Sequence, residues 1–460
     1  MNKIKIHKIL LILFNVCLVN GQAIKKEKMV DYFTNNGWSA AVKTMQHPAG
    51  EYYKGITYVA FQGPKEDPYV AAYNHEKKQW AGPFKAGVSL MGKDPNYKID
   101  NHGKPAMIID DAGYIHLMFG GHGGLPEHGE NLLGNTHYGA MKHVVSKRPL
   151  DITEWEVLDN IPPFGCYNQF VKMDNGDIYL FYRHGAHKSN WVYRKSTDNA
   201  RTFAEPVSIL KTKPATSTTA KSEVQDSWYA WFANGQGNDI IATYNYHVCK
   251  EPNHNGERHN CYYMVMDTDT KEWRNVAGEK LTLPVTKELS DEKTLVVDTD
   301  TDWTVRGAVR LDIKGYPHII FYKGENNGGK HAVNKKVIYY RWTGKKWMTA
   351  ESPNLPEATG DILVSSPKKA SLLLAAKIND VPELAWWKTK DGGNSFEKGK
   401  VLYKGKKGSI GTSARIRNAH PDARVIIYGN HKGDYRKMYL VGNHGPIKRL
   451  KTEANQLKEQ

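Results

Sequence analysis

The chain has 460 residues with 64 Lys and Arg against 48 Asp and Glu, a formal net charge of +16. This length allows a large buried core, and the positive charge favours a polyanionic partner, the alternative being a surface charge that serves solubility alone. No recognised DNA- or RNA-binding motif accompanies the charge, so we expect no nucleic-acid partner.

The first residues, 1–21, are interpreted as a secretory signal peptide. Three lysines precede an apolar run over 9–19, and small residues follow at Asn20 and Gly21. The run is too short for a comfortable membrane span and no other stretch is long enough, so we expect a secreted protein without a membrane segment. A lipid anchor at Cys17 is the alternative, but the residues before Cys17 are not the small ones that such a site needs.

A turn followed by an alternating apolar and aromatic run occurs seven times. Gly113–Gly124, GYIHLMFGGHGG, is the clearest copy, and the others begin near residues 52, 175, 237, 314, 378 and 421. A period of roughly 60 residues built from short strands is typical of propeller blades. We therefore predict an all-β fold, a single-domain seven-bladed β-propeller over 22–450, with a polar tail at 451–460 that frays. The apolar stretch Trp38–Met45 is expected to close the ring against the last blade.

Two repeats end in similar motifs, STDNARTF at Ser196–Phe203 and TKDGGNSF at Thr389–Phe396. Both resemble the Asp-box of sialidase-type propellers, although Ala200 replaces the glycine of the first motif. In that motif the Asp side chain holds the hairpin turn and the aromatic residue packs between sheets. We therefore assign the two motifs a structural role and no catalytic one.

Polar residues occupy equivalent positions in the repeats, and a propeller brings such positions to one mouth of its central channel. The polar residues at the predicted starts of the inner strands and ends of the second strands are His102, His122, Tyr167, Arg183, His184, Tyr229, Arg306, Lys323 and Lys388. None is a carboxylate, whereas glycoside hydrolysis commonly needs two acids or a Tyr backed by an acid. Any one of these side chains alone is more often a packing or hydrogen-bonding residue than a catalyst.

The collected groups suit β-elimination from a uronic acid. A cation must neutralise the sugar carboxylate, a base must remove the C5 proton, and an acid must protonate the leaving O4. Arg183 fits the first role because its guanidinium meets a carboxylate with two parallel hydrogen bonds. Imidazole and phenol groups fit the other two roles, and we assign Tyr229, Arg306 and His184 to substrate contacts.

Two H-x-C motifs, His247 with Cys249 and His259 with Cys261, indicate a metal site. Alternate residues of a strand face the same side, so each motif offers two ligands, and two imidazoles with two thiolates form a closed tetrahedral zinc site. A zinc ion with four protein ligands would hold the intervening loop and would not activate water. A Cys249–Cys261 disulfide is the alternative in an oxidising compartment.

These motifs resemble those of the ulvan lyases of polysaccharide lyase family 25, secreted seven-bladed propellers, over nearly the whole mature chain. The resemblance rests on the segments DNHGKP, FGGHGG, GCYNQF, LFYRHG, DSWYAWF and YHVCKEPNHNGERHNCYY. It implies that His102, His122 and Tyr167 form the proton-transfer centre, that Arg183 neutralises the carboxylate, and that Tyr229 lies in the substrate cleft. It also implies that the two H-x-C motifs together bind one structural zinc ion.

The substrate that the family implies is ulvan, a sulfated polysaccharide of rhamnose 3-sulfate with glucuronic or iduronic acid, cut by β-elimination to an unsaturated uronyl end. We expect Tyr167 to protonate the leaving oxygen and, for one uronate epimer, also to act as base, with His122 or His102 as base for the other epimer. We expect a monomer. The rival functions are a sialidase-like hydrolase, indicated by the Asp-boxes, and a non-catalytic propeller that binds polyanions.

Overall fold

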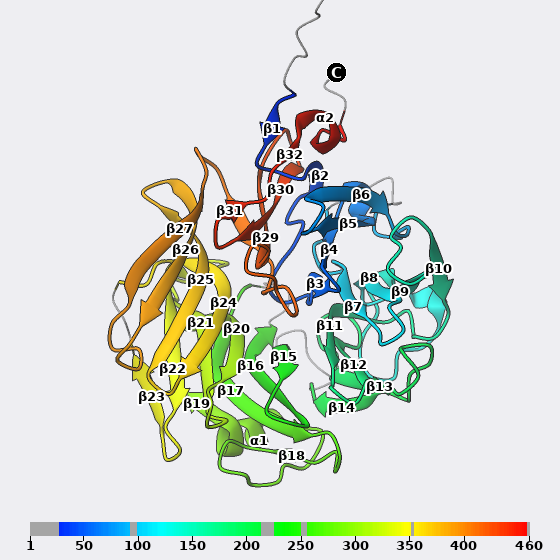
Figure 1. Ribbon diagram of the computed structural model, residues 1–460. Coiled ribbons are helices and arrows are strands. Elements are labelled where there is room, and N and C mark those ends of the chain that lie inside the picture. Colours follow the sequence, from blue (N-terminus) through cyan, green and yellow to red (C-terminus); the bar gives the residue numbers. More distant parts are fainter. Residues whose placement is uncertain (1–26, 93–98, 213–224, 250–254, 351–353, 458–460) are drawn as a thin grey trace, which may run out of the picture.

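The computed structural model describes residues 27–92, 99–212, 225–249, 255–350 and 354–457, so the predicted signal peptide lies outside the described residues. Seven antiparallel sheets are arranged in a ring around a central axis (Figure 1). This arrangement confirms the predicted seven-bladed β-propeller. No helix within the described ranges is long and apolar enough to cross a membrane.

Each of the first three blades is a four-stranded sheet whose strands follow one another in the sequence. Blade 1 comprises β3 (Gly50–Tyr53), β4 (Ile56–Gln62), β5 (Pro68–Asn74) and β6 (Gln79–Lys85). Blade 2 comprises β7 (Ala106–Ile109), β8 (Ile115–His122), β9 (Tyr138–Ser146) and β10 (Trp155–Leu158). Blade 3 comprises β11 (Cys166–Lys172), β12 (Ile178–Arg183), β13 (Trp191–Ser196) and β14 (Val207–Leu210). Short helical turns lie in the loops of blades 1 and 2, namely η1 (Pro64–Glu66) and η2 (Pro126–His128).

The next three blades repeat this order, with one extra strand in blade 4. Blade 4 comprises β15 (Gln225–Asn234), β16 (Asp239–Cys249), β17 (Arg258–Asp267) and β18 (Trp273–Arg274), with β19 (Leu295–Val297) beside β17 after α1 (Lys287–Leu289) and η3 (Ser290–Thr294). Blade 5 comprises β20 (Trp303–Leu311), β21 (Pro317–Glu325), β22 (Val333–Trp342) and β23 (Trp347–Ala350). Blade 6 comprises β24 (Ala358–Ser366), β25 (Lys369–Ile378), β26 (Val381–Thr389) and β27 (Glu397–Lys404).

The N-terminal part of the chain closes the ring, but with a different segment from the one predicted. Blade 7 combines β28 (Ile410–Thr412), β29 (Val425–Asn430) and β30 (Tyr435–Gly442) with β2 (Thr34–Trp38), which pairs with β30. The predicted strand Trp38–Met45 overlaps β2 only at its first residue. The sequence pattern missed β2 because its buried positions are polar, with Thr34 Oγ1 donating to Asn36 Oδ1 at 2.6 Å.

The C-terminal tail is docked as far as residue 457, so the expectation that it frays is wrong for 451–457. After β31 (Gly445–Pro446), β32 (Arg449–Leu450) pairs with β1 (Met29–Val30), and α2 (Lys451–Ala454) follows beside β1 (Figure 1). Ala454 is fully buried, and Tyr32 Oη donates to Asn455 Oδ1 at 2.8 Å. Burial of one small side chain and pairing with the N-terminal segment therefore order a polar stretch.

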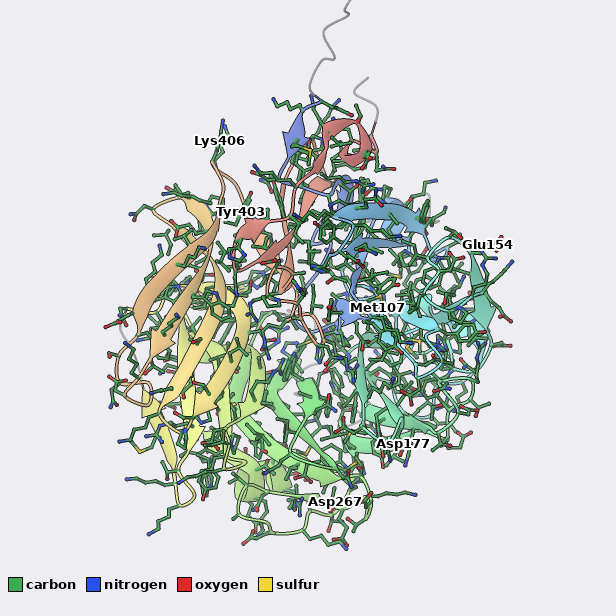
Figure 2. The ribbon with its side chains drawn as sticks, in the orientation of Figure 1. Met107, Glu154, Asp177, Asp267, Tyr403 and Lys406 are labelled. Atoms are coloured by element: carbon green, nitrogen blue, oxygen red, sulfur yellow. The ribbon has the colours of Figure 1, made fainter. Side chains whose placement is uncertain are left out.

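Apolar side chains fill the spaces between neighbouring blades. One cluster, with Trp231 and Val309 among its members, joins blades 4, 5 and 6, and further clusters join every remaining pair of neighbours around the ring. In Figure 2, Met107 lies toward the middle of the ring, and Glu154 and Asp267 lie at its outer edge. The continuous packing holds the inner strands in fixed positions around the channel.

The two Asp-box motifs make the same turn, which supports their structural role. Ser196 Oγ donates to Asp198 Oδ1 at 2.7 Å, and Thr202 donates to Asp198 through its backbone N at 2.9 Å and its hydroxyl at 2.6 Å. Ala200 adopts φ 58°, which explains why a glycine is usual there. Corresponding hydrogen bonds in the second motif join Thr389, Asp391 and Ser395.

Candidate active site

A cavity of about 740 Å³ lies near the point where the inner strands of the blades begin. This is the channel mouth that the repeat positions predicted. The polar and aromatic residues that line the cavity include His102, Tyr167, Tyr229, Arg258, Tyr322, His331, Lys335, Glu357 and Lys377.

Five of the predicted site residues form one cluster at this mouth. His102, Tyr167 and Tyr229 line the cavity. The imidazole of His122 stacks on that of His102, with ring centroids 3.6 Å apart and planes at 5°. The Tyr167 ring lies 5.2 Å from His102, and the guanidinium of Arg183 lies 4.9 Å from the Tyr167 centroid and 5.4 Å from that of Tyr229. The structure thus brings together imidazole, phenol and guanidinium groups from blades 2, 3 and 4.

Glycines allow the end of β8, which carries His122, to approach its neighbours. A Cβ atom at Gly121 would lie 2.2 Å from the carbonyl oxygen of Gly165, just before β11, so a larger residue would push blades 2 and 3 apart. The backbone N of Gly120 donates to the carbonyl of Gly103 at 2.8 Å, which ties the strand end to the turn before β7. The glycine-rich sequence around His122 therefore positions the two histidines together.

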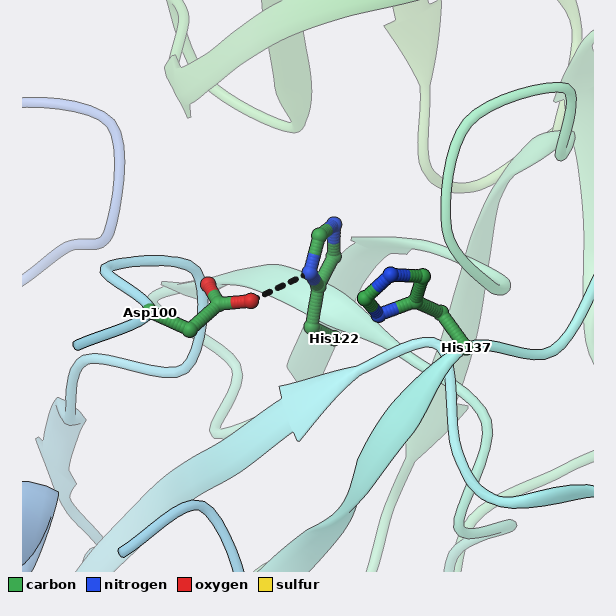
Figure 3. Close-up of side chains that lie close together, drawn as sticks. All are labelled: Asp100, His122 and His137. Carbon is green, nitrogen blue, oxygen red and sulfur yellow. Dashed lines mark hydrogen bonds and ion pairs between the residues drawn. The ribbon is translucent and has the colours of Figure 1, made fainter. Parts of the chain in front are cut away.

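A carboxylate joins the two stacked histidines, so the prediction of an acid-free site is wrong. Asp100 accepts a hydrogen bond from Nδ1 of His102. It accepts a second one, at 2.5 Å, from Nδ1 of His122 (Figure 3). It also accepts from the backbone N of His102 at 3.1 Å, which makes an Asx-turn. Asp100 lies in the loop before β7, outside the repeat positions, and the Asp two residues before His102 was the only signal for it.

The hydrogen bonds to Asp100 define which imidazole nitrogens can accept a proton. Because Nδ1 of each histidine donates to the carboxylate, Nε2 is the ring nitrogen that is left to accept a proton. Burial lowers the pKa of His102 to about 3 against the opposing effect of Asp100, so this imidazole is neutral at neutral pH. Burial alone would raise the pKa of Asp100, but the hydrogen bonds from His102 and His122 hold it below its usual range.

The two tyrosines differ in their readiness to ionise. Burial, together with the neighbouring Tyr229, raises the pKa of Tyr167, which therefore keeps its proton at neutral pH. Burial opposes ionisation of Tyr229 as well, but Arg258 and Arg183 outweigh it and lower the pKa of Tyr229. Tyr167 adopts φ 61° at a bulge in β11, and its backbone N donates to the carbonyl of His102 at 3.3 Å. Such a left-handed conformation is uncommon for a residue other than glycine and is typical of functional sites.

Arg183 lies behind the tyrosines and has no exposed surface. Its Nη1 donates to Ser227 Oγ at 3.4 Å, while its Nε and Nη2 have no hydrogen-bond partner among the described residues. A buried guanidinium without a carboxylate partner is costly, which favours a functional reason for its place. In this arrangement its charge faces two tyrosine rings and does not reach the cavity.

His184, which was assigned to a substrate contact, does not join the cluster in the described structure. His184 is 6% exposed, donates from Nδ1 to Asn131 Oδ1 at 3.0 Å, and is absent from the cavity lining. Burial lowers the pKa of His184 to about 4. Arg306 is the bulged residue of β20, next to Val305 in the cavity wall, and its side chain lies outside the described part of the chain.

Three further side chains at the site were missed by the sequence analysis. The guanidinium of Arg258 lies 4.1 Å from the Tyr229 ring centroid, and Arg258 lines the cavity. His187 Nε2 is 3.2 Å from Tyr229 Oη, and the His137 ring lies 4.6 Å from that of His122. His137 and His187 lie in loops and Arg258 begins β17, so none occupies a position that recurs from blade to blade.

The predicted zinc ligands do not all face the same side of their sheet. Strand pairing places His259 opposite Tyr246, so these two face one side and His247 faces the other. A bulge at Asn260, with φ 61°, interrupts the alternation and turns Cys261 to the side opposite His259. The assumption that each H-x-C motif offers two ligands together therefore fails for His259 and Cys261.

The described side chains of three of the four predicted zinc ligands do not converge on one point. His247, His259 and Cys261 do not form a group of ligand atoms within 4.8 Å of one another, and the side chain of Cys249 lies outside the described residues. Within the described part of the chain, Asp100, His122 and His137 meet that distance (Figure 3). Asp100 already holds two imidazoles, so we assign this group to proton transfer. The zinc site stays a prediction.

Comparison with known proteins identifies the family. Residues 131–355 match a family described as "BNR repeat-containing family member". A protein from Nonlabens ulvanivorans named "Ulvan lyase" is 52% identical over 441 residues, 94% of this chain and 93% of the relative. A protein from Pseudoalteromonas sp. (strain PLSV) named "Ulvan Lyase-PL25" is 48% identical over 444 residues, 94% of this chain and 90% of the relative. The chain belongs to the ulvan lyase family.

Solved structures of ulvan lyases have the same fold. A PL25 ulvan lyase matches with a TM-score of 0.89 at 48% identity, covering 94% of this chain and 100% of that chain. A second structure, with the same TM-score, identity and coverage, is of a PL25 ulvan lyase bound to -[GlcA(1-4)Rha3S]-. These similarities confirm the predicted resemblance and show that this ulvan lyase family member is a polysaccharide lyase.

Proposed function

We propose that this enzyme cleaves ulvan by β-elimination at the uronic acid and leaves a 4,5-unsaturated uronyl end. The observation that carries the proposal is the proton-transfer cluster at the cavity wall. His102 presents a neutral imidazole oriented by Asp100, and Tyr167 beside it retains its proton. The relative that was solved with a sulfated uronate oligosaccharide supports the choice of substrate.

The cluster supplies a base and an acid for the two proton transfers. Nε2 of His102 removes the C5 proton, the electrons of the C5–H bond form the C4=C5 double bond, and the C4–O4 bond breaks. The hydroxyl of Tyr167 protonates O4 as it leaves. Of the two histidines considered as base, His102 lines the cavity and His122 lies behind it. Glucuronate and iduronate are C5 epimers, so for one of them Tyr167 also serves as base, a role that requires its phenol to lose its own proton before it takes the C5 proton.

Arg183 contributes electrostatically from behind the tyrosines. Its positive charge lies 4.9 Å and 5.4 Å from the Tyr167 and Tyr229 ring centroids, in a buried environment where charges interact strongly. It stabilises negative charge that develops on the phenols and on the neighbouring uronate when protons move. The proposed role thus requires no direct contact between Arg183 and the sugar.

The presence of Asp100 does not support the alternative function of a glycoside hydrolase. Both of its oxygens accept hydrogen bonds from imidazoles, so it is not free to act as acid or nucleophile. Glu357 is the only carboxylate among the residues that line the described cavity, and it forms an ion pair with Lys335 at 3.0 Å. Hydrolysis with two acids would need a second carboxylate beside the first.

The test is the ultraviolet absorbance of the unsaturated product when the purified enzyme is mixed with ulvan. We expect absorbance to grow with ulvan and to stay flat with chondroitin, heparin and alginate. New reducing ends without absorbance would identify a hydrolase. Binding of ulvan without any new chain ends would identify a non-catalytic propeller.

We also propose that the chain is secreted and monomeric. The predicted signal peptide at 1–21 supports secretion, and mass spectrometry of the protein from the culture medium should show an N-terminus near residue 22. Light scattering should give the mass of a single chain. Metal analysis of protein purified without chelators decides whether the H-x-C motifs bind zinc, with Cys261→Ser as the variant expected to lose it.

A further inference from the structure

The wall of the cavity between blades 4 and 5 is built around Arg258. Its guanidinium lies 4.1 Å from the Tyr229 ring centroid, and its Nη1 donates to the carbonyl of Gly256 at 3.2 Å. The backbone N of Gly256 donates to the carbonyl of Lys330 at 2.7 Å, which joins the loop before β17 to the loop before β22. A Cβ atom at Gly256 would lie 3.1 Å from His331 Nδ1, so the two loops meet closely. The guanidinium is therefore held in place by a ring, a carbonyl and an interblade contact.

The positive charge of this wall is only partly balanced by an acid, because Glu357 pairs with Lys335 at 3.0 Å and the other cations of the lining outnumber it. Arg258 forms no ion pair with a carboxylate among the described residues, and its Nε has no hydrogen-bond partner there. The charged residues that line the cavity are Lys43, Arg258, Lys335 and Lys377 on the basic side and Glu357 on the acidic side. A guanidinium offers a planar fork of donors that suits oxyanions such as sulfate and carboxylate. The position of Arg258 is thus that of an anion-binding residue.

The order of contacts along the wall separates this residue from the reaction centre. Tyr167 contacts both His102 and Tyr229, with ring centroids 5.2 Å and 5.4 Å apart, and Tyr229 in turn contacts Arg258. A uronate placed for proton transfer at His102 and Tyr167 therefore has Arg258 beside the next sugar. In the oligosaccharide bound to the solved relative, the sugar next to glucuronate is a sulfated rhamnose.

We propose that Arg258, supported by Lys335 and His331, binds the sulfate ester of the sugar adjacent to the uronate. This inference rests on the proposed cleavage of ulvan and adds the residue that recognises sulfation. The loop contact between blades 4 and 5 holds the site, so binding of sulfate would fix the register of the polymer relative to His102 and Tyr167. Sulfate recognition would then act mainly on KM.

The experiment compares native ulvan with chemically desulfated ulvan for the wild type and for Arg258→Gln. We expect desulfation to raise the KM of the wild type by about 10- to 100-fold, the range for a lost charge-assisted hydrogen bond pair. Arg258→Gln should raise KM on native ulvan by a similar factor and should no longer distinguish the two polymers. Turnover at saturation should change little, because the proton-transfer cluster is intact.

Two further variants complete the test. Arg274→Gln, in the same blade but paired with Asp239 at 2.7 Å outside the cavity lining, should keep the wild-type preference for sulfated polymer. Lys335→Gln should weaken the preference by about two- to fivefold, a range expected of a partly exposed charge, and it carries the test if Arg258→Gln fails to fold.

The outcomes distinguish a failure of the proposed ulvan cleavage from a failure of the proposed sulfate site. If the wild type forms no unsaturated product from ulvan, the proposed function itself fails. If the wild type is active but Arg258→Gln lowers turnover equally on both polymers and keeps their ratio, Arg258 binds the uronate carboxylate and the sulfate site is refuted. An unchanged KM in Arg258→Gln and in Lys335→Gln would also refute it.

Discussion

Replacing Asp100 by Asn keeps the shape of the side chain and removes its charge, so it tests whether this carboxylate orients the two imidazoles. An amide has one acceptor oxygen, and at least one of the hydrogen bonds from Nδ1 of His102 and Nδ1 of His122 must be lost. A hydrogen bond to a charged group contributes about 1.5–3 kcal/mol, and about 1.4 kcal/mol corresponds to a factor of ten. We therefore expect turnover to fall about 10- to 150-fold if one bond is lost and about 10²- to 10⁴-fold if both are.

The assay is the growth of ultraviolet absorbance with ulvan, measured from about pH 2 to about pH 9, because the pKa of His102 lies at about 3 and the acid limb must fall inside the range. Asp100 raises the pKa of His102 against the effect of burial, so the variant should move the acid limb toward lower pH. A role limited to holding the loop would not move that limb.

Asp422→Asn is the matched control, because Asp422 accepts from His444 Nδ1 at 2.6 Å on an exposed turn of blade 7. We expect wild-type activity and an unchanged pH profile in this control. The reasoning is refuted if folded Asp100→Asn retains turnover within about threefold of the wild type, less than one lost hydrogen bond predicts, or if its acid limb stays in place.

Tyr167→Phe removes the proposed proton donor and should lower turnover on glucuronate and iduronate linkages by about 10²- to 10⁴-fold; wild-type turnover on both would contradict the assignment. Asp198→Ala removes the hydrogen bonds of the first Asp-box and should lower the free energy of unfolding by about 1–3 kcal/mol without changing turnover, as measured by thermal unfolding and by activity. Burial lowers the pKa of His143 from 6.5 to about 3, so below pH 6.5 the unfolded chain binds the extra proton and stability falls as the pH drops toward 3. Urea unfolding should show this loss, at most about 1.4 kcal/mol per pH unit from this group, and His143→Asn should reduce the slope; equal slopes would contradict the argument.

The repeat architecture could be predicted because period-2 alternation of apolar residues specifies both a strand and its buried face. The organising segment Gly113–Gly124 contains β8, and its equivalents lie in the second strands of the other blades. The same regularity identified His102, Tyr167 and Tyr229, because residues at equivalent positions of a propeller converge at one mouth. The closing strand was predicted at 38–45 and not at β2, because the buried residues of β2 are polar and give no apolar pattern.

The residues that the sequence left out depend on where loops meet. Asp100 was missed because it lies in a loop. The loop places its carboxylate next to His102 and His122, which follow it by 2 and 22 residues in the chain. The sequence pattern did not predict the bulge at Asn260, which turns Cys261 to the side of the strand opposite His259, and the zinc site itself stays a prediction. No local sequence pattern predicts a bulge of this kind.

By itself the sequence determined the seven-bladed ring, the family and most of the proton-transfer cluster, since each follows from periodic burial or from short motifs. Only the tertiary structure decided that a carboxylate orients the histidines, that Arg183 lies behind the tyrosines and that Arg258 stands at the cavity wall. The physical reason is that these relations arise between blades, where strand register, glycine contacts and loop packing set the distances between residues far apart in the chain.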